Sequence, residues 1–271
     1  MFAERWVYDL IIYLYALGLL FAFADLLHKN RRANRLALSL FIAVWMIQTV
    51  FIAFRLFELF PLLTPFDSLF FYSWAIVALT MLINWLYRMD LVVFSANLVG
   101  FAVLAINFFV ARDTSRHLSR LLLSELVFVH VTMAFLAYAA FSLSAVFAVL
   151  YLIGDHLLKQ KKWNRLLRLL PSLEHLQRLS YGFSLIGMPL LLSSIILGVI
   201  WAYQTNISGF WYDPKIIGSL IVLLLYAIQL YQKAKQRWHG RRLAWWSAVS
   251  FLAMLLNYWI SVTGLSFHRW M

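Results

Sequence analysis

The sequence of 271 residues contains no cysteine. That absence excludes disulfide bonds, thiolate metal sites, thiolate-ligated haem and the Cys-x-x-Cys-His attachment of c-type haem. Gly-rich phosphate loops, His-Glu-x-x-His pairs and nucleophile elbows are also missing. The few carboxylates are scattered along the chain and are not paired for acid–base chemistry. We therefore expect a protein that is not an enzyme.

Charge is scarce, and long apolar runs take its place. Charged residues make up 13% of the chain and hydrophobic residues 64%, against about 25% and about 45–50% in a soluble domain. Each apolar run is long enough to cross about 30 Å of hydrocarbon as a helix. We expect an all-α integral membrane protein that forms a single transmembrane domain over residues 1–271. Eight spans are predicted: 6–27, 36–57, 66–87, 91–111, 125–153, 179–203, 214–232 and 243–266.

The basic residues follow a pattern along these spans. Sixteen of the 23 lie in the links after the first, third, fifth and seventh spans. Because positive residues are retained on the cytoplasmic side, both termini of this multi-pass protein are predicted to face outward. The net charge of +12 is then explained by topology and contact with anionic lipid. Nucleic-acid binding is not expected.

The longest basic link, residues 154–178, contains "LLKQKKWNRLLRLL", in which leucines alternate with basic residues at helical spacing. This pattern is typical of a helix that lies on the inner membrane face. The same surface is also suited to docking a cytoplasmic partner.

The outer link before the seventh span ends in "GFWYDPK", residues 209–215. Asp213 fits the N-cap of a helix, and Pro214 fits its first position, where a missing N–H has no cost. These two residues do not explain the three aromatic residues before them. Phe210, Trp211 and Tyr212 are interpreted either as part of an interfacial aromatic belt or as the wall of a binding site.

Two histidines lie in apolar settings near the outer face: His130, inside the fifth span, and His268, after the eighth. Ionisable side chains at membrane depth are functional candidates, although a single one is more often a packing residue. Imidazoles can ligate haem iron, and cations can pair with haem propionates. The pattern is consistent with haem or a similar planar ligand, and a transporter without a cofactor competes with that interpretation. The cations predicted on the same side are Arg112, Arg116, Arg120, Lys215 and Arg269.

Three segments of the chain resemble a known family. "IWAYQTNISGFWYDPKIIGSLIVLLLYAIQLY" is similar to the tryptophan-rich loop and following helix of the cytochrome c assembly superfamily, which includes the CcsA/ResC and CcmC proteins. "HVTMAFLAYAAF" and "GLSFHRW" resemble the segments with its two haem-ligating histidines. The resemblance implies haem b at the outer face, with His130 and His268 as the iron ligands. The implied pocket is Phe210, Trp211, Tyr212, Asp213, Pro214 and Lys215.

The chain also departs from the superfamily. Ile216 stands where the family has glutamate, and Tyr231 where its transport-type members have a membrane histidine. Over its whole length the chain is most similar to a group encoded beside haem-biosynthesis enzymes in Bacillus-type bacteria, and this resemblance implies a multi-pass protein of the bacterial cytoplasmic membrane. That group is understood to lower the level of glutamyl-tRNA reductase, so the resemblance implies feedback on tetrapyrrole synthesis, with the reductase or its membrane protease or regulators as partners. Two alternatives stay open: a haem carrier for cytochrome c assembly, and a regulator with this fold that binds no haem.

Overall fold

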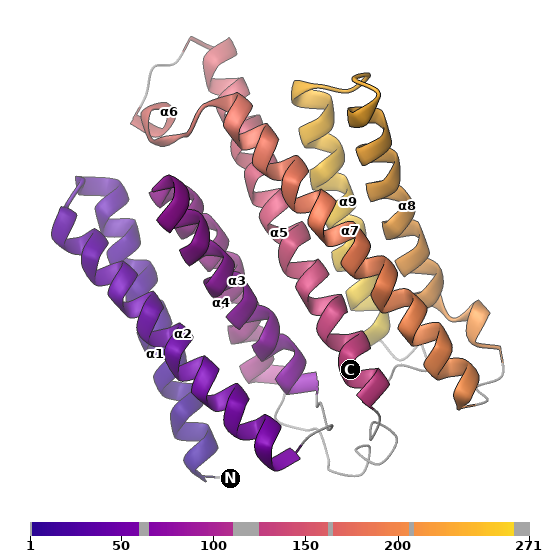
Figure 1. Ribbon diagram of the computed structural model, residues 1–271. Helices are drawn as coiled ribbons and strands as arrows, with labels where there is room; N and C mark the ends of the chain where they lie inside the picture. The colour runs from indigo at the N-terminus through magenta and orange to yellow at the C-terminus, as the bar shows by residue number, and fades with distance from the viewer. Residues whose placement is uncertain (1, 60–64, 111–124, 162–164, 206–208, 263–271) are drawn as a thin grey trace. The chain divides into compact units, whose positions relative to one another are not determined.

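A computed structural model describes residues 2–59, 65–110, 125–161, 165–205 and 209–262 (Figure 1). These residues form helices joined by short turns, which confirms the all-α class. Seven of the described helices are long and apolar enough to cross a membrane. α4 (Asp90–Val110) is the remaining long helix, and its apolar described stretch is the shorter Asp90–Ile106. The count of eight spans and the outward termini stay predictions.

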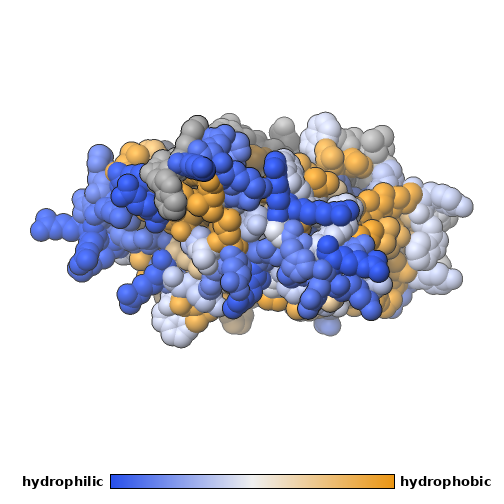
Figure 2. Space-filling view, turned by 90° about the horizontal axis from the view of Figure 1, so that it is seen from above, coloured by the Kyte–Doolittle hydropathy of each residue, from blue (hydrophilic) through white to orange (hydrophobic). Residues whose placement is uncertain are grey.

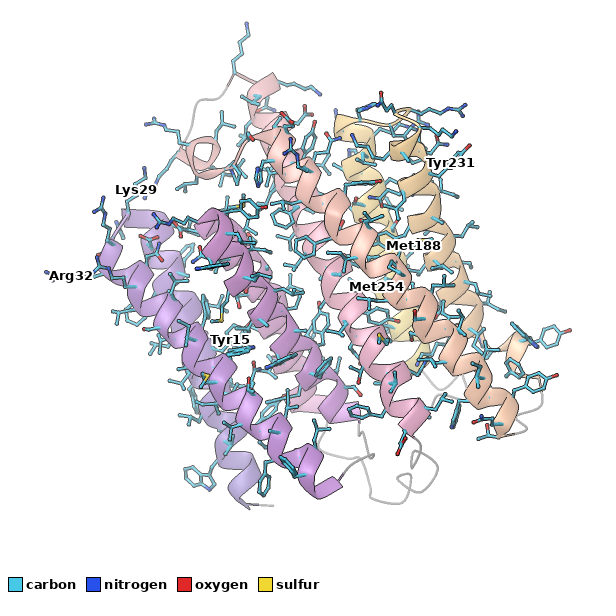
Figure 3. All side chains as sticks on the ribbon, viewed as in Figure 1. Tyr15, Lys29, Arg32, Met188, Tyr231 and Met254 are labelled. Atoms are coloured by element: carbon cyan, nitrogen blue, oxygen red, sulfur yellow. The ribbon has the colours of Figure 1, made fainter. Side chains whose placement is uncertain are left out.

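The described chain forms two compact units. The first contains most of the four N-terminal helices, which are α1 (Phe2–His28), α2 (Arg31–Leu59), α3 (Pro65–Tyr87) and α4. Tyr15 of α1 is fully buried (Figure 3), and its hydroxyl donates to Asn97 Oδ1 of α4 at 2.9 Å. The Asn97 amide in turn donates to Thr80 Oγ1 of α3 at 2.9 Å. Three helices of this unit are thus joined by side-chain hydrogen bonds. The single transmembrane domain expected from the sequence stays a prediction.

The second unit is built around α5 (Glu125–Lys159). Its middle is buried on all sides, and it is rich in small residues that let neighbouring helices approach closely within lipid. α7 (Leu173–Gln204) runs alongside α5, and α8 (Pro214–Ala234) and α9 (Gly240–Val262) form an antiparallel pair beside them (Figure 1). These four helices carry the candidate site described below.

Four helices are followed by a residue other than glycine with a positive φ angle. Lys29, Arg88, Lys161 and Gln236 follow α1, α3, α5 and α8 and have φ between 49° and 54°. A residue in the left-handed region turns the chain away from the helix axis, and here long polar side chains occupy the position where glycine is commonest. With each unit taken by itself, the view from above in Figure 2 shows hydrophilic residues over its helix ends. The basic links therefore lie at chain reversals, as the sequence predicts.

The basic link 154–178 differs from its prediction. α5 continues to Lys159 because no breaker interrupts it, and it therefore takes up Leu157 and Leu158. α6 (Arg165–Leu169) is only five residues long, and α7 begins at Leu173 after the cap residue Ser172, whose hydroxyl accepts from His175 N at 3.3 Å. In the described residues the helical pattern of this link is thus divided between the end of α5 and the short α6, and its place on the inner membrane face stays a prediction.

Candidate functional site

His130 lies near the start of α5 and faces α7. Its Nδ1 is 2.6 Å from the backbone oxygen of Ser194. A carbonyl oxygen can only accept, so Nδ1 carries the proton in this contact. In the neutral ring the lone pair is then on Nε2, the arrangement that a metal-ligating histidine needs. The contact with Ser194 thus fixes both the tautomer and the direction of the imidazole.

Ser194 also holds the backbone of α5. Its hydroxyl donates to the His130 carbonyl oxygen at 3.0 Å and lies 3.2 Å from Nδ1. Ser194 is only 2% exposed, so these contacts are shielded from solvent. A buried hydrogen bond of this kind is costly to break, because its partners are left without replacements. His130 is therefore positioned by both the main chain and the side chain of one residue.

Gly198, one turn further along α7, makes room for the ring. A Cβ atom at this position would lie 2.7 Å from His130 Cε1. The ring cannot turn aside freely, because Nδ1 is held by Ser194. Glycine here is explained by the imidazole packed against the backbone.

We expect Gly198→Ala to displace the His130 ring and weaken any ligand held through Nε2. Losing an outer-shell partner of a ligating histidine typically costs about 10–100-fold in affinity, and we expect a loss in that range. Titration of the purified variant with ferric haem, followed by absorption, measures the effect. Gly182→Ala is the matched control, because nothing lies within 4 Å of a Cβ at that position of α7. Equal affinity of the two variants would contradict the prediction.

The start of α8 lies at the same end of the unit. Asp213 caps the helix, with Oδ1 accepting from Lys215 N at 2.9 Å, and Pro214 takes the first helical position. This confirms the cap predicted from the sequence. Asp213 and Lys215 are both buried, at 6% and 9% exposure. The site thus combines an imidazole with a buried lysine side chain.

The three aromatic residues before the cap differ in exposure, although the rings of Phe210 and Trp211 stay in contact, with centroids 4.8 Å apart. Phe210, Trp211 and Tyr212 form a short 3-10 helix, η3 (Phe210–Tyr212), in which successive side chains point about 120° apart. Phe210 is buried and meets Tyr203 edge-on, with ring centroids 6.2 Å apart. Trp211 is 54% exposed and Tyr212 85% exposed. A wall made of all three residues, as the sequence suggested, stays a prediction.

A polar group from α9 completes this end of the unit. Asn257 donates from Nδ2 to Ser219 Oγ at 3.0 Å and also interacts with the Tyr138 hydroxyl. Gly218 is adjacent, and a Cβ there would collide with the Asn257 amide. Because Asn257 pairs with a residue near the start of α8, α9 runs toward the His130 end. Asn257, Ser194 and Gly198 were not singled out in the sequence, although the last two are spaced four residues apart, as on one helix face.

Several predicted site residues fall beyond the described part of the chain. His268 follows the end of α9 at Val262 and lies outside the described residues, as do Arg112, Arg116, Arg120 and Arg269. Ligation of one iron by His130 and His268 therefore stays a prediction. Tyr231 is 56% exposed on the flank of α8 (Figure 3). Among the described residues, no group of three or more His, Cys, Asp or Glu side chains gathers as a metal site.

Comparison with known proteins gives the chain two kinds of relative. Residues 62–267 match the family described as "Cytochrome C assembly protein". The chain is 41% identical to Protein HemX of Brevibacillus brevis over 268 residues, which cover 98% of each protein. It is 42% identical to Protein HemX of Bacillus subtilis, covering 95% of this chain and 94% of that one. The cytochrome c biogenesis protein CcsA of Guillardia theta is 27% identical, over 77% of this chain and 74% of its own.

Proposed function

This chain belongs to the HemX group of the cytochrome c assembly protein family, and on that premise we propose that it is a haem-binding membrane protein. The contact between His130 Nδ1 and the Ser194 carbonyl carries the proposal, because it leaves the lone pair of the neutral ring on Nε2. His268 is the proposed second ligand. Bound haem would supply an iron centre and two carboxylates, and Lys215 is the buried lysine at the same end of the unit.

The described residues fit this ligand in three respects. A histidine whose other nitrogen is held by a backbone carbonyl is the usual protein ligand of iron in haem b. Phe210 provides an aromatic face at the start of α8, and the Asp213 cap fixes its position relative to Lys215. We propose a binding role without catalysis, in the cytoplasmic membrane, with eight spans and the His130 end outward.

Haem uptake by the detergent-purified protein tests this function. We expect a Soret band that grows with added haem and saturates near one haem per chain, as expected for a single two-histidine site. A protein that is purified colourless and takes up no added haem would overturn the proposal. Human serum albumin added as a competitor distinguishes the site from non-specific partition of haem into the detergent micelle.

The proposed biological role is feedback on tetrapyrrole synthesis, through the level of glutamyl-tRNA reductase. The resemblance of the chain to the HemX group motivates it, and the basic link 154–178 is the proposed partner surface. In the described part of that link Lys161, Arg165 and Arg168 are exposed and available to an acidic partner. The site at His130 would then sense haem, and the basic link at the other end of the unit would contact the partner.

We expect that replacing Lys161, Arg165 and Arg168 with glutamine abolishes control of the reductase, so that the protein no longer lowers the reductase level. The measurement is the reductase level, by immunoblot, in a Bacillus subtilis strain that lacks its own HemX and produces this chain at matched abundance. Arg31, Arg32 and Arg35 of α2 are also exposed, and their triple glutamine variant is the matched control for loss of positive charge. If both variants lower the reductase as well as the unchanged protein does, the basic link is not the partner surface.

A further inference from the structure

A cluster of polar side chains lies in the middle of the second unit, where all four long helices meet. It contains Ser144 of α5, Ser180 and Ser184 of α7, Gln229 of α8 and Ser247 of α9, none more than 4% exposed. Ser144 Oγ is 2.8 Å from Ser184 Oγ, and Gln229 Nε2 donates to Ser247 Oγ at 2.7 Å and to Ser184 Oγ at 3.3 Å. We call this group the serine–glutamine cluster.

Close helix packing explains the serines but leaves part of the cluster unaccounted for. Small residues let helices approach within lipid, and Ser144 and Ser180 each donate to the other's backbone oxygen. Three buried polar atoms nearby, however, have no hydrogen-bond partner in the described part of the chain: Gln229 Oε1, Tyr226 Oη and Ser250 Oγ. All three side chains are fully buried. A buried polar atom without a partner is costly in protein and more so in a membrane.

The pairing of α8 with α9 brings these three groups together. Ser219 of α8 is hydrogen-bonded to Asn257 of α9, and Gln229 of α8 to Ser247 of α9. The two bonds are ten residues apart on each helix, and the helices run in opposite directions. Tyr226 and Ser250 each lie three residues from the Gln229–Ser247 pair on the side toward His130, and they therefore occupy matching positions on the two helices. One helical turn separates them from Gln229.

The chemistry of the three atoms selects the ligand. Gln229 Oε1 can only accept a hydrogen bond, whereas the hydroxyls of Tyr226 and Ser250 can both donate and accept. The three side chains carry no formal charge, so neither a cation nor an anion would be compensated. We propose that this layer binds water, which donates to Gln229 Oε1 and bridges the two hydroxyls. A buried water typically makes about three hydrogen bonds, and this site offers three polar partners.

The packing around the site holds its position and closes it toward His130. The Tyr226 ring is stacked on Phe141 of α5, with centroids 3.7 Å apart, and Phe141 rests on the backbone of α7 at Gly187. Val222 and Met254 come next along α8 and α9 toward His130, and both are 2% exposed. The water is therefore a resident ligand that joins α8 and α9 to the cluster, distinct from the proposed haem site.

Radiolytic hydroxyl-radical labelling of the full-length protein in nanodiscs tests for this water, because radicals formed from a buried water oxidise the side chain beside it. We expect Tyr226 to be oxidised several-fold faster than Tyr15. Both tyrosines are fully buried, but the Tyr15 hydroxyl is satisfied by Asn97. Equal protection of the two residues would overturn the proposal. The result does not depend on haem, because Val222 and Met254 separate Tyr226 from the His130 end of its unit and Tyr15 belongs to the first unit.

A second measurement uses Tyr226→Phe, which removes only the hydroxyl. If the hydroxyl binds water, the variant loses a satisfied network, and the apparent melting temperature falls by about 2–4 °C. If the hydroxyl has no partner at all, its removal relieves an unfavourable burial, and the melting temperature stays the same or rises. The latter outcome contradicts the proposal. Ser250→Ala is expected to act in the same direction and also to slow the labelling of Tyr226.

Discussion

Purified His130→Ala protein is expected to lose the Soret band of haem that the unchanged protein acquires. The substitution removes the imidazole nitrogen that would bind the iron, while the Ser194 hydroxyl can still bond to the backbone oxygen of residue 130. We expect the loss of affinity to exceed the about 10–100-fold typical of an outer-shell partner. Absorption spectra with and without added imidazole measure it, because free imidazole can occupy the cavity and restore part of the band.

A parallel experiment with His268→Ala tests whether two histidines share one iron. Loss of either ligand from a two-histidine site is expected to shift the Soret band and weaken binding, so the two variants are expected to give similar spectra. His239→Ala is the matched control, because that histidine is exposed in the α8–α9 link at the opposite end of the unit. Unchanged haem binding by His130→Ala would remove His130 from the site. A change in His130→Ala alone would leave His268 without a ligating role.

Sequence analysis located the helices well because their signals are local. The apolar runs placed every long helix, and Asp213-Pro214 placed the start of α8 at the correct residue. The sequence placed the C-terminal end of α5 and the start of α7 less well. Hydropathy detects only the part of a helix that matches hydrocarbon, whereas α5 continues through charged residues to Lys159 and α7 begins at Leu173. A helix ends where its backbone hydrogen bonds end, and polar residues do not by themselves break them.

The contacts of the site could not be predicted in the same way. His130 was a candidate because an ionisable residue at membrane depth is unusual, but its partner Ser194 is 64 positions away on a different helix. Helical periodicity gives the faces of α5 and α7 without showing which residues meet across them. The short η3 helix had a similar effect: three consecutive aromatic residues were interpreted together, but Phe210 is buried while Trp211 and Tyr212 are exposed.

Gly187→Ala is expected to destabilise the second unit more than any other single-methyl addition proposed for α7. A Cβ at Gly187 would lie 2.6 Å from Cε1 and 2.8 Å from Cδ1 of Phe141. Phe141 has no room to move away, because its other face is stacked on Tyr226 at 3.7 Å between ring centroids, and both side chains are fully buried. The added methyl group must therefore displace either the ring pair or the backbone of α7.

The expected cost is about 1–3 kcal/mol, the range for overpacking a closely packed core. The measurement is the apparent melting temperature of the variant in detergent, beside Gly182→Ala as the matched control. Both glycines lie in the interior of α7, and nothing lies within 4 Å of a Cβ at Gly182. Alanine is favoured over glycine in a helix by about 0.5–1 kcal/mol, so the control is expected to be neutral or stabilised. Two variants of the same helix with the same chemical change should then shift in opposite directions. Equal melting temperatures of Gly187→Ala and Gly182→Ala would contradict the prediction, because they would show that the Phe141 ring does not pack closely against the backbone of α7 at Gly187.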